Sequence, residues 1–164
     1  MHRRTFIRSL GLTTTVGAAW LGMWFTAPAA TAAPAACPAP GLAATRSTDG
    51  TASCSARSDT GGAAAAYGIE ATASADAAPS SLSLAIAQGG GVATSNSTFL
   101  SGPAAIAVGP DARVTTSGVR PGLSIGIAGP GATVAVTGVT APTCGGGFGF
   151  AGDFQTGQAC FSPR

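Results

Sequence analysis

The segment GPDARVTTSGV (residues 109–119) aligns without a gap on GPGATVAVTGV (residues 129–139), twenty residues further along the chain. The tripeptide AIA recurs at the same offset, at residues 85–87 and 105–107. Fainter copies begin at Gly68 and Gly89, so that the repeat glycines lie 21, 20 and 20 residues apart. Such a period indicates a stack of similar units, each with a short strand, a Gly/Pro turn, a second short strand and a Gly turn.

Large aliphatic residues alternate within these units, as in Leu82-x-Leu84-x-Ile86 and Leu123-x-Ile125-x-Ile127. Alternation at every second residue is typical of strands, and Gly/Pro turns every nine to eleven residues leave no room for a long helix. Ile106 and Val108 are out of phase with the residues before Gly129, so we expect a bulge or a different strand pairing there. We therefore predict an all-β repeat body over residues 63–142.

The core of this body is expected to be thin, because small residues recur at the positions that we assign to its interior. These positions are Ala71, Val92, Ala112 and Ala132, and then Ala73, Thr94, Val114 and Val134. The intervening residues are expected outside: Thr72, Ser74 and Asp76; Ala93, Ser95 and Ser97; Arg113, Thr115 and Ser117; Thr133, Ala135 and Thr137. A parallel β-solenoid with one 20-residue coil per repeat accounts for the ladders. A small antiparallel β-sandwich, or a largely disordered chain, remains open.

The sequence AIAVG at residues 105–109 resembles the β-roll heads of surface adhesins, which favours the solenoid. The start of the chain carries a second resemblance. Arg3-Arg4-Thr5-Phe6-Ile7 precedes an apolar run over residues 10–27 and a small-residue stretch, and so resembles a twin-arginine export signal with Arg3, Arg4 and Phe6 as its motif. This resemblance implies that the twin-arginine machinery and signal peptidase process residues 1–32. Retention of the 18-residue apolar run as a membrane anchor is the alternative.

Two segments flank the repeat body. Residues 33–62 are rich in Ala, Pro, Ser and Thr, with Leu42 as their single large aliphatic residue, so we expect an irregular, disordered leader without a core. Residues 143–164 form a tail rich in Gly and Phe. Phe148, Phe150 and Phe154 lie in this tail and either cap the last repeat or form a contact patch.

Four cysteines, an even number in an exported chain, predict two disulfides. Pairing Cys37 with Cys54 and Cys144 with Cys160 would close one short loop in the leader and one in the tail. The nested pairing of Cys37 with Cys160 and Cys54 with Cys144 would instead join the two ends. A zinc site is disfavoured because no CxxC pair is present and the single histidine, His2, lies in the export signal. A lipid-attachment role for Cys37 is disfavoured by the lack of an aliphatic residue at position 34.

The charge balance limits the partners of the processed chain. Cleavage after Ala32 would leave 132 residues with five arginines and six acidic residues, hence a net charge of −1 and no lysine. A chain with so few cations neutralises few phosphates, so we expect neither nucleic-acid binding nor polybasic attachment to membranes.

Three motifs superficially match those of enzymes, and each has a structural explanation. Gly122-Leu123-Ser124-Ile125-Gly126 fits the nucleophile-elbow pattern, but the processed chain has no histidine and the segment alternates like a strand. Residues 147–152 fit the dinucleotide fingerprint without the strand, helix or distal acid that it needs. Glu70 and Asp111 are better explained as turn residues than as a glycosidase pair. We therefore expect no enzymatic activity and no cofactor.

The export signal, the paired cysteines and the Ala/Gly-rich β-repeat together resemble a family of small exported proteins of unknown function from high-GC Gram-positive bacteria. The resemblance implies export and a compact β domain, and assigns no activity. We expect a secreted or cell-surface protein of structural or interaction type, with a cell-envelope component or a second copy as partner. A polysaccharide-binding or cell-wall-active module is the alternative, disfavoured because the processed chain has no Trp and only Tyr67.

Overall fold

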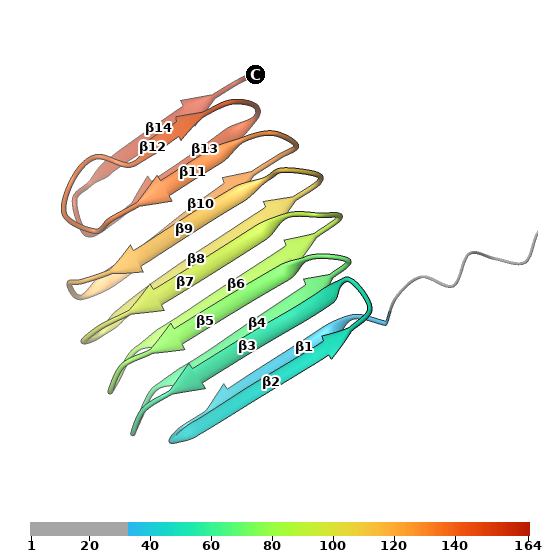
Figure 1. Cartoon of the computed structure of the whole chain (residues 1–164). Helices are drawn as coiled ribbons and strands as arrows, with labels where there is room; N and C mark the ends of the chain where they lie inside the picture. Colours follow the sequence, from blue (N-terminus) through green and yellow to red (C-terminus); the bar gives the residue numbers. More distant parts are fainter. Residues whose placement is uncertain (1–32) are drawn as a thin grey trace, which may run out of the picture. The chain divides into compact units, whose positions relative to one another are not determined.

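The computed structural model describes residues 33–164, and the expected export signal at residues 1–32 lies outside the described residues. Residues 33–164 form fourteen strands in two stacked sheets and no helix (Figure 1). None of the described residues belongs to a helix that is long and apolar enough to cross a membrane.

Each sheet contains seven strands. The first, which we call sheet A, has in spatial order β1 (Ala35–Pro40), β4 (Ala63–Ile69), β6 (Leu82–Gln88), β8 (Ser101–Val108), β10 (Gly122–Ala128), β13 (Gly149–Asp153) and β14 (Gln158–Ser162). The second, sheet B, has β12 (Thr143–Gly145), β11 (Thr133–Val136), β9 (Arg113–Gly118), β7 (Val92–Ser97), β5 (Thr72–Ala77), β3 (Ala52–Ser58) and β2 (Ala43–Asp49).

The path of the chain confirms the β-solenoid, and the sandwich alternative is wrong. From β3 to β11 the chain alternates between the sheets, and the successive strands within each sheet pair in parallel. Antiparallel pairs occur only at the two ends, where β1 and β2 close one end and β12, β13 and β14 close the other. These end strands cap the repeats, which would otherwise expose bare strand edges.

Strand register shows how the coils differ in length. Successive coils of sheet A pair Ala63 with Leu82, Leu84 with Ala104, and Gly102 with Leu123, so they span 19, 20 and 21 residues. The longer third coil brings Ile127 opposite Ile106, which is the different pairing that the phase shift before Gly129 predicted.

The same variation corrects one expectation about the faces. Val92 and Thr94, which we expected inside, point outward with Asn96, while Ala93, Ser95 and Ser97 are buried. The repeat glycines do not occupy equivalent places, since Gly68 pairs with Ala87 and not with Gly89. Because the turns differ in length, counting from these glycines displaced β7 by one residue, and one residue exchanges the two faces of a strand.

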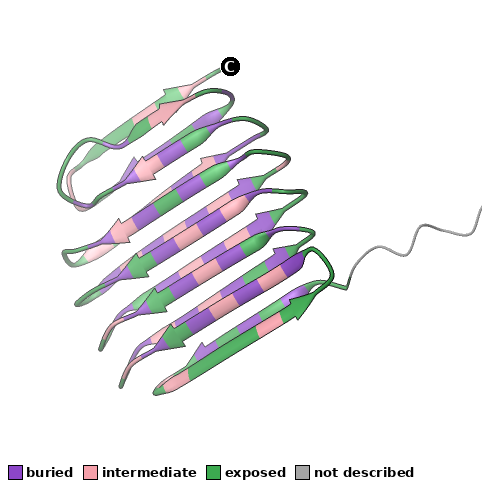
Figure 2. Ribbon diagram, in the orientation of Figure 1, coloured by how far each residue is buried: buried purple, intermediate pink, exposed green. Residues whose placement is uncertain are grey.

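Buried positions alternate with less buried ones along the strands of the stack (Figure 2), and the residues at the buried positions are mostly small. The ladder in sheet A that begins and ends with a cysteine is Cys37, Ala66, Ala85, Ala105, Gly126, Ala151 and Cys160. Its counterpart in sheet B is Cys54, Ala73, Ala93, Val114, Val134 and Cys144. The two ladders face each other, since a disulfide joins them at each end.

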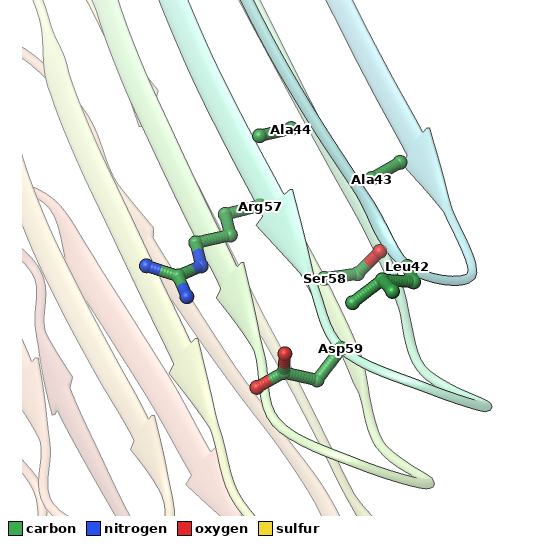
Figure 3. A pocket seen from close by; sticks show the side chains of 6 residues that line it. All are labelled: Leu42, Ala43, Ala44, Arg57, Ser58 and Asp59. Carbon is green, nitrogen blue, oxygen red and sulfur yellow. The ribbon is translucent and has the colours of Figure 1, made fainter.

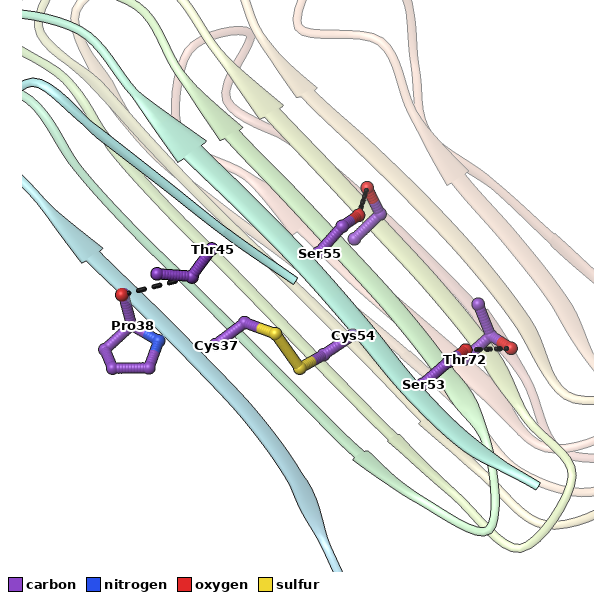
Figure 4. The surroundings of a disulfide bond; sticks show 8 residues. Cys37, Pro38, Thr45, Ser53, Cys54, Ser55 and Thr72 are labelled. Atoms are coloured by element: carbon purple, nitrogen blue, oxygen red, sulfur yellow. Dashed lines mark hydrogen bonds between the residues drawn. A yellow bond between two sulfur atoms is a disulfide. The ribbon is translucent and has the colours of Figure 1, made fainter. Parts of the chain in front are cut away.

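The disulfides pair Cys37 with Cys54 and Cys144 with Cys160, as the local pairing predicted, and the nested alternative is wrong. Each bond crosses from one sheet to the other, as Figure 4 shows for Cys37 on β1 and Cys54 on β3. The Cα atoms lie 5.8 Å apart in both bonds. This distance is usual for a disulfide, and the bonds hold the two ladders together at both ends.

A glycine in sheet A makes room for two of the three valines in the core. A Cβ atom at Gly126 would lie 2.8 Å from Cγ1 of Val114 and 3.2 Å from Cγ1 of Val134. Sheet A therefore carries a glycine where sheet B carries larger residues, and the sum of the facing side-chain volumes stays small.

The expectation of a disordered leader at residues 33–62 is wrong, although its disulfide is confirmed. This segment forms β1, β2 and β3, and Ala35, Ala39 and Ala52 are completely or almost completely buried. The expectation rests on the lack of large aliphatic residues in this segment. In this fold the core consists mainly of alanine, together with cysteine, buried serine and three valines, so the leader has the composition that the first coil requires.

Candidate functional site

The outer face of sheet A is apolar from one end of the stack to the other. Its central column is continuous in register: Ala36, Tyr67, Ile86, Ile106, Ile127, Phe150 and Phe161. A second column consists of Pro38, Ala65, Leu84, Ala104, Ile125, Gly152 and Ala159. We call these two columns, together with Leu82, Gly102 and Leu123, the apolar face. The large residues of the alternating strands thus lie outside the solenoid and the small ones inside.

No strand of sheet A places a charged side chain on this face. Asp153 is the single charged residue in these strands, and it is buried, with its carboxylate accepting hydrogen bonds from the backbone N–H of Gln155 and the hydroxyl of Thr156. The apolar face is open to solvent: the side chains of Leu82 and Leu123 are 59% and 62% exposed. Contiguous apolar surface of this kind is uncommon on soluble monomers and marks a contact surface.

A shallow hollow of about 310 Å³ lies in the apolar face. Its floor includes Gly102 and Ala104 of β8, and Leu82, Leu84 and Leu123 stand around it. Since β8 is the fourth of the seven strands, the hollow lies near the middle of the sheet.

Of the three residues in the expected aromatic patch, only Phe150 belongs to the two columns of the apolar face. Phe150 is 38% exposed and continues the central column beside Ile127. Phe148 is 43% exposed and packs edge-to-face on Phe161, with ring centroids 5.9 Å apart. Phe154 is 75% exposed and follows the end of β13. None of these rings enters the core, and the end of the solenoid is closed by the strands of the tail.

The outer face of sheet B is polar. It carries the expected Thr72, Ser74 and Asp76, then Arg113, Thr115 and Ser117. Neighbouring hydroxyls bond to one another: Ser53 donates to Thr72 over 3.0 Å, and Ser55 and Ser74 share a hydrogen bond of 3.1 Å (Figure 4). Arg46 and Arg57 also lie on this face, which therefore has the character of an ordinary solvated surface.

An open pocket of about 360 Å³ lies at the first coil and is lined by Leu42, Ala43, Ala44, Arg57, Ser58 and Asp59 (Figure 3). The hydroxyl of Ser58 donates to the backbone carbonyl oxygens of Ala39, at 2.6 Å, and of Gly41. Since its proton is used in these bonds, the hydroxyl cannot donate to a ligand. The charged groups that the pocket offers are then the guanidinium of Arg57 and the carboxylate of Asp59, both in an open site.

The enzyme-like motifs lie where the structural explanations place them. Ser124 is buried within β10 and faces the interior, so its hydroxyl cannot meet a substrate. Glu70 and Asp111 have positive φ values of 51° and 58° and occupy turns. Gly149 and its successors form β13 and no phosphate-binding loop. Within residues 33–164 no three metal-ligating side chains of His, Cys, Asp or Glu gather together.

Comparison with protein families finds one match over residues 1–163, to the model described as "Family of unknown function (DUF6764)". No curated protein matches the chain, and no solved structure does.

Proposed function

The chain belongs to that family, and we propose that it is an exported, non-enzymatic interaction protein whose contact surface is the apolar face. The observation that carries the proposal is the uncharged outer side of a seven-stranded sheet with leucines about 60% exposed. Burial of apolar area stabilises by about 25 cal/mol per Å². A partner that covers this face removes its apolar side chains from water, so the complex gains this stabilising free energy.

The disulfides support export. They occupy the two ends of the core ladders, and such bonds persist in oxidising compartments outside the cytoplasm. The twin-arginine motif at Arg3 and Arg4 suggests the route, with removal of residues 1–32 and a final location in the medium or at the cell surface.

Replacing Arg3 and Arg4 by lysine is expected to trap the precursor inside the cell. The export receptor of this route reads the arginine pair, and lysine keeps the charge but loses the planar guanidinium. Cell fractionation and immunoblotting would measure the secreted share, with an Arg8→Lys variant as the control that keeps the pair. Unchanged secretion of the double variant would show that another pathway exports the chain.

A single acidic residue on the apolar face tests its role as a contact surface. In culture medium, and in cell extracts prepared under mild conditions, we expect the wild-type protein to run on native gels as a complex. Ile106→Asp, at the centre of the face, is expected to release the free chain, because an unpaired charge in an apolar contact is costly. Thr94→Asp, at the middle of β7 on sheet B, is the matched control and should keep the complex. Equal behaviour of the two variants would contradict the proposal.

Binding of cell-wall polysaccharide is a second candidate. One observation favours it: the exposed rings of Tyr67, Phe150 and Phe161 lie in one column of a flat face. Aromatic rings at such spacing stack on sugar rings, but here three isoleucines separate Tyr67 from the phenylalanines. Co-sedimentation with insoluble cell wall is the corresponding assay.

A further inference from the structure

We propose that the occupant of the apolar face is a second copy of the same chain, packed face to face through sheet A about a two-fold axis near β8. This inference rests on the proposed role of the apolar face as a contact surface. It adds the identity of the partner.

The area of the face suits a dimer. Seven strands about six residues long, spaced about 4.8 Å apart, cover roughly 600 Å². Two copies would therefore bury about 1,200 Å² in total, which is the lower end of the range for specific and stable interfaces.

The arrangement of the exposed leucines suits a two-fold axis along β8. A two-fold axis pairs each surface patch with itself, so the patch on the axis must accept its own copy. Leu82 on β6 and Leu123 on β10 flank Gly102 of the middle strand on either side. With the axis along β8, β10 of one copy lies over β6 of the other, so the exposed Leu123 of one copy meets the exposed Leu82 of the other. Flat sheets packed in this way interdigitate their side chains as in a β-sandwich.

The charges near the face favour a protein partner of the same kind over a membrane. The turns that join the strands of sheets A and B carry three acidic residues, Asp59, Glu70 and Asp111, and one basic residue, Arg120. A net negative border is repelled by anionic lipid headgroups, whereas membrane-binding surfaces normally carry Lys or Arg there. The outer face itself is uncharged, so two copies that pack through it bury no charged side chain of that face.

End-to-end stacking is the other way to join two solenoids, and the first strand opposes it. β1 forms one edge of sheet A and contains Pro38 and Pro40, which have no N–H group to donate to an added strand. β1 is therefore a poor edge for the addition of a strand from a second copy.

The test uses protein purified from the medium or envelope of cells that express the full chain. Light scattering coupled to size exclusion is expected to give twice the mass of one processed chain. Ala104→Arg places a guanidinium at the centre of the interface and is expected to raise the dimer dissociation constant by about 100-fold or more. Thr94→Arg, the matched variant on sheet B, should leave the mass and the dissociation constant unchanged. Leu123→Ser removes a side chain without adding a charge and should weaken the dimer about tenfold.

Thermal unfolding followed by circular dichroism at a concentration where all variants are monomeric checks that each one folds. A monomeric wild-type protein overturns the inference. If the native complex in cells is still lost in Ile106→Asp, the apolar face remains the contact surface and the partner is another molecule; binding to vesicles of neutral phospholipid or to cell wall would then identify it. A dimer that survives both Ala104→Arg and Leu123→Ser also overturns the inference, because it uses another surface. A monomer whose behaviour in cells is insensitive to Ile106→Asp refutes the proposed function as well.

Discussion

Ala105→Leu is expected to destabilise the protein by at least about 3 kcal/mol, since the new side chain has no space to enter. Ala105 is completely buried in β8 and belongs to the ladder that ends in Cys37 and Cys160. The facing ladders lie 5.8 Å apart between Cα atoms at both ends. The added atoms must push the sheets apart, and the sheets are held by a disulfide at each end.

An outward alanine of sheet B provides the control. Ala135 lies on the outer face of that sheet between Thr115 and Thr143, away from the apolar face, where a leucine meets only side-chain neighbours and solvent. Ala135→Leu should change the free energy of unfolding by less than about 0.5 kcal/mol, as surface substitutions usually do. Urea unfolding followed by circular dichroism measures both variants. Similar losses for the two would mean that the inner ladder is not as tightly packed as described.

Removing the disulfide at the C-terminal end, by Cys144→Ala with Cys160→Ala, is expected to cost about 3 kcal/mol of unfolding free energy. The bond closes a loop with a sequence separation of 16 residues and holds β12 in sheet B to β14 in sheet A. For a chain of this size, that loss corresponds to a decrease in melting temperature of about 10 °C. Cys37→Ala with Cys54→Ala, with a separation of 17, should cost a similar amount.

The quadruple variant separates a local effect from a global one. The two bonds lie at opposite ends of the same ladders, so they share no neighbours and their losses should add to about 6 kcal/mol. Calorimetry of the four-cysteine series under oxidising conditions measures this sum. A loss well above the sum would show that each bond depends on the other, which the separate ends do not predict.

Several features were predictable from local sequence because they depend on short-range rules. The ungapped match of residues 109–119 to 129–139 predicted the parallel pairing of Arg113 with Thr133. The local disulfide pairing is correct, because a single strand, β2 or β13, lies between the two cysteines of each pair. The placement of Glu70 and Asp111 in turns followed from their positions after a repeat strand.

The identity of the contact surface was harder to predict. The aromatic tail suggested Phe148, Phe150 and Phe154, yet Phe150 matters as one member of a column that includes Tyr67, four strands away in sheet A. Phe161 belongs to the same column and was not singled out. Their alternation with buried residues was the available signal, but the column exists only once the register of every strand is known.

The sequence by itself indicated the all-β repeat, its period and the presence of two unlike faces on each strand, and it reduced the cysteine pairing to two alternatives. For the strands of sheet A it did not determine which face is inside. Alternation of Leu82, Leu84 and Ile86 with Ser83, Ala85 and Ala87 is equally consistent with either orientation, and burial of apolar area alone favours the large residues inside. The tertiary structure decided the opposite: the inner ladders pack so closely that even a Cβ at Gly126 would lie 2.8 Å from Cγ1 of Val114, so the small residues pack inside and the large ones form the outer face.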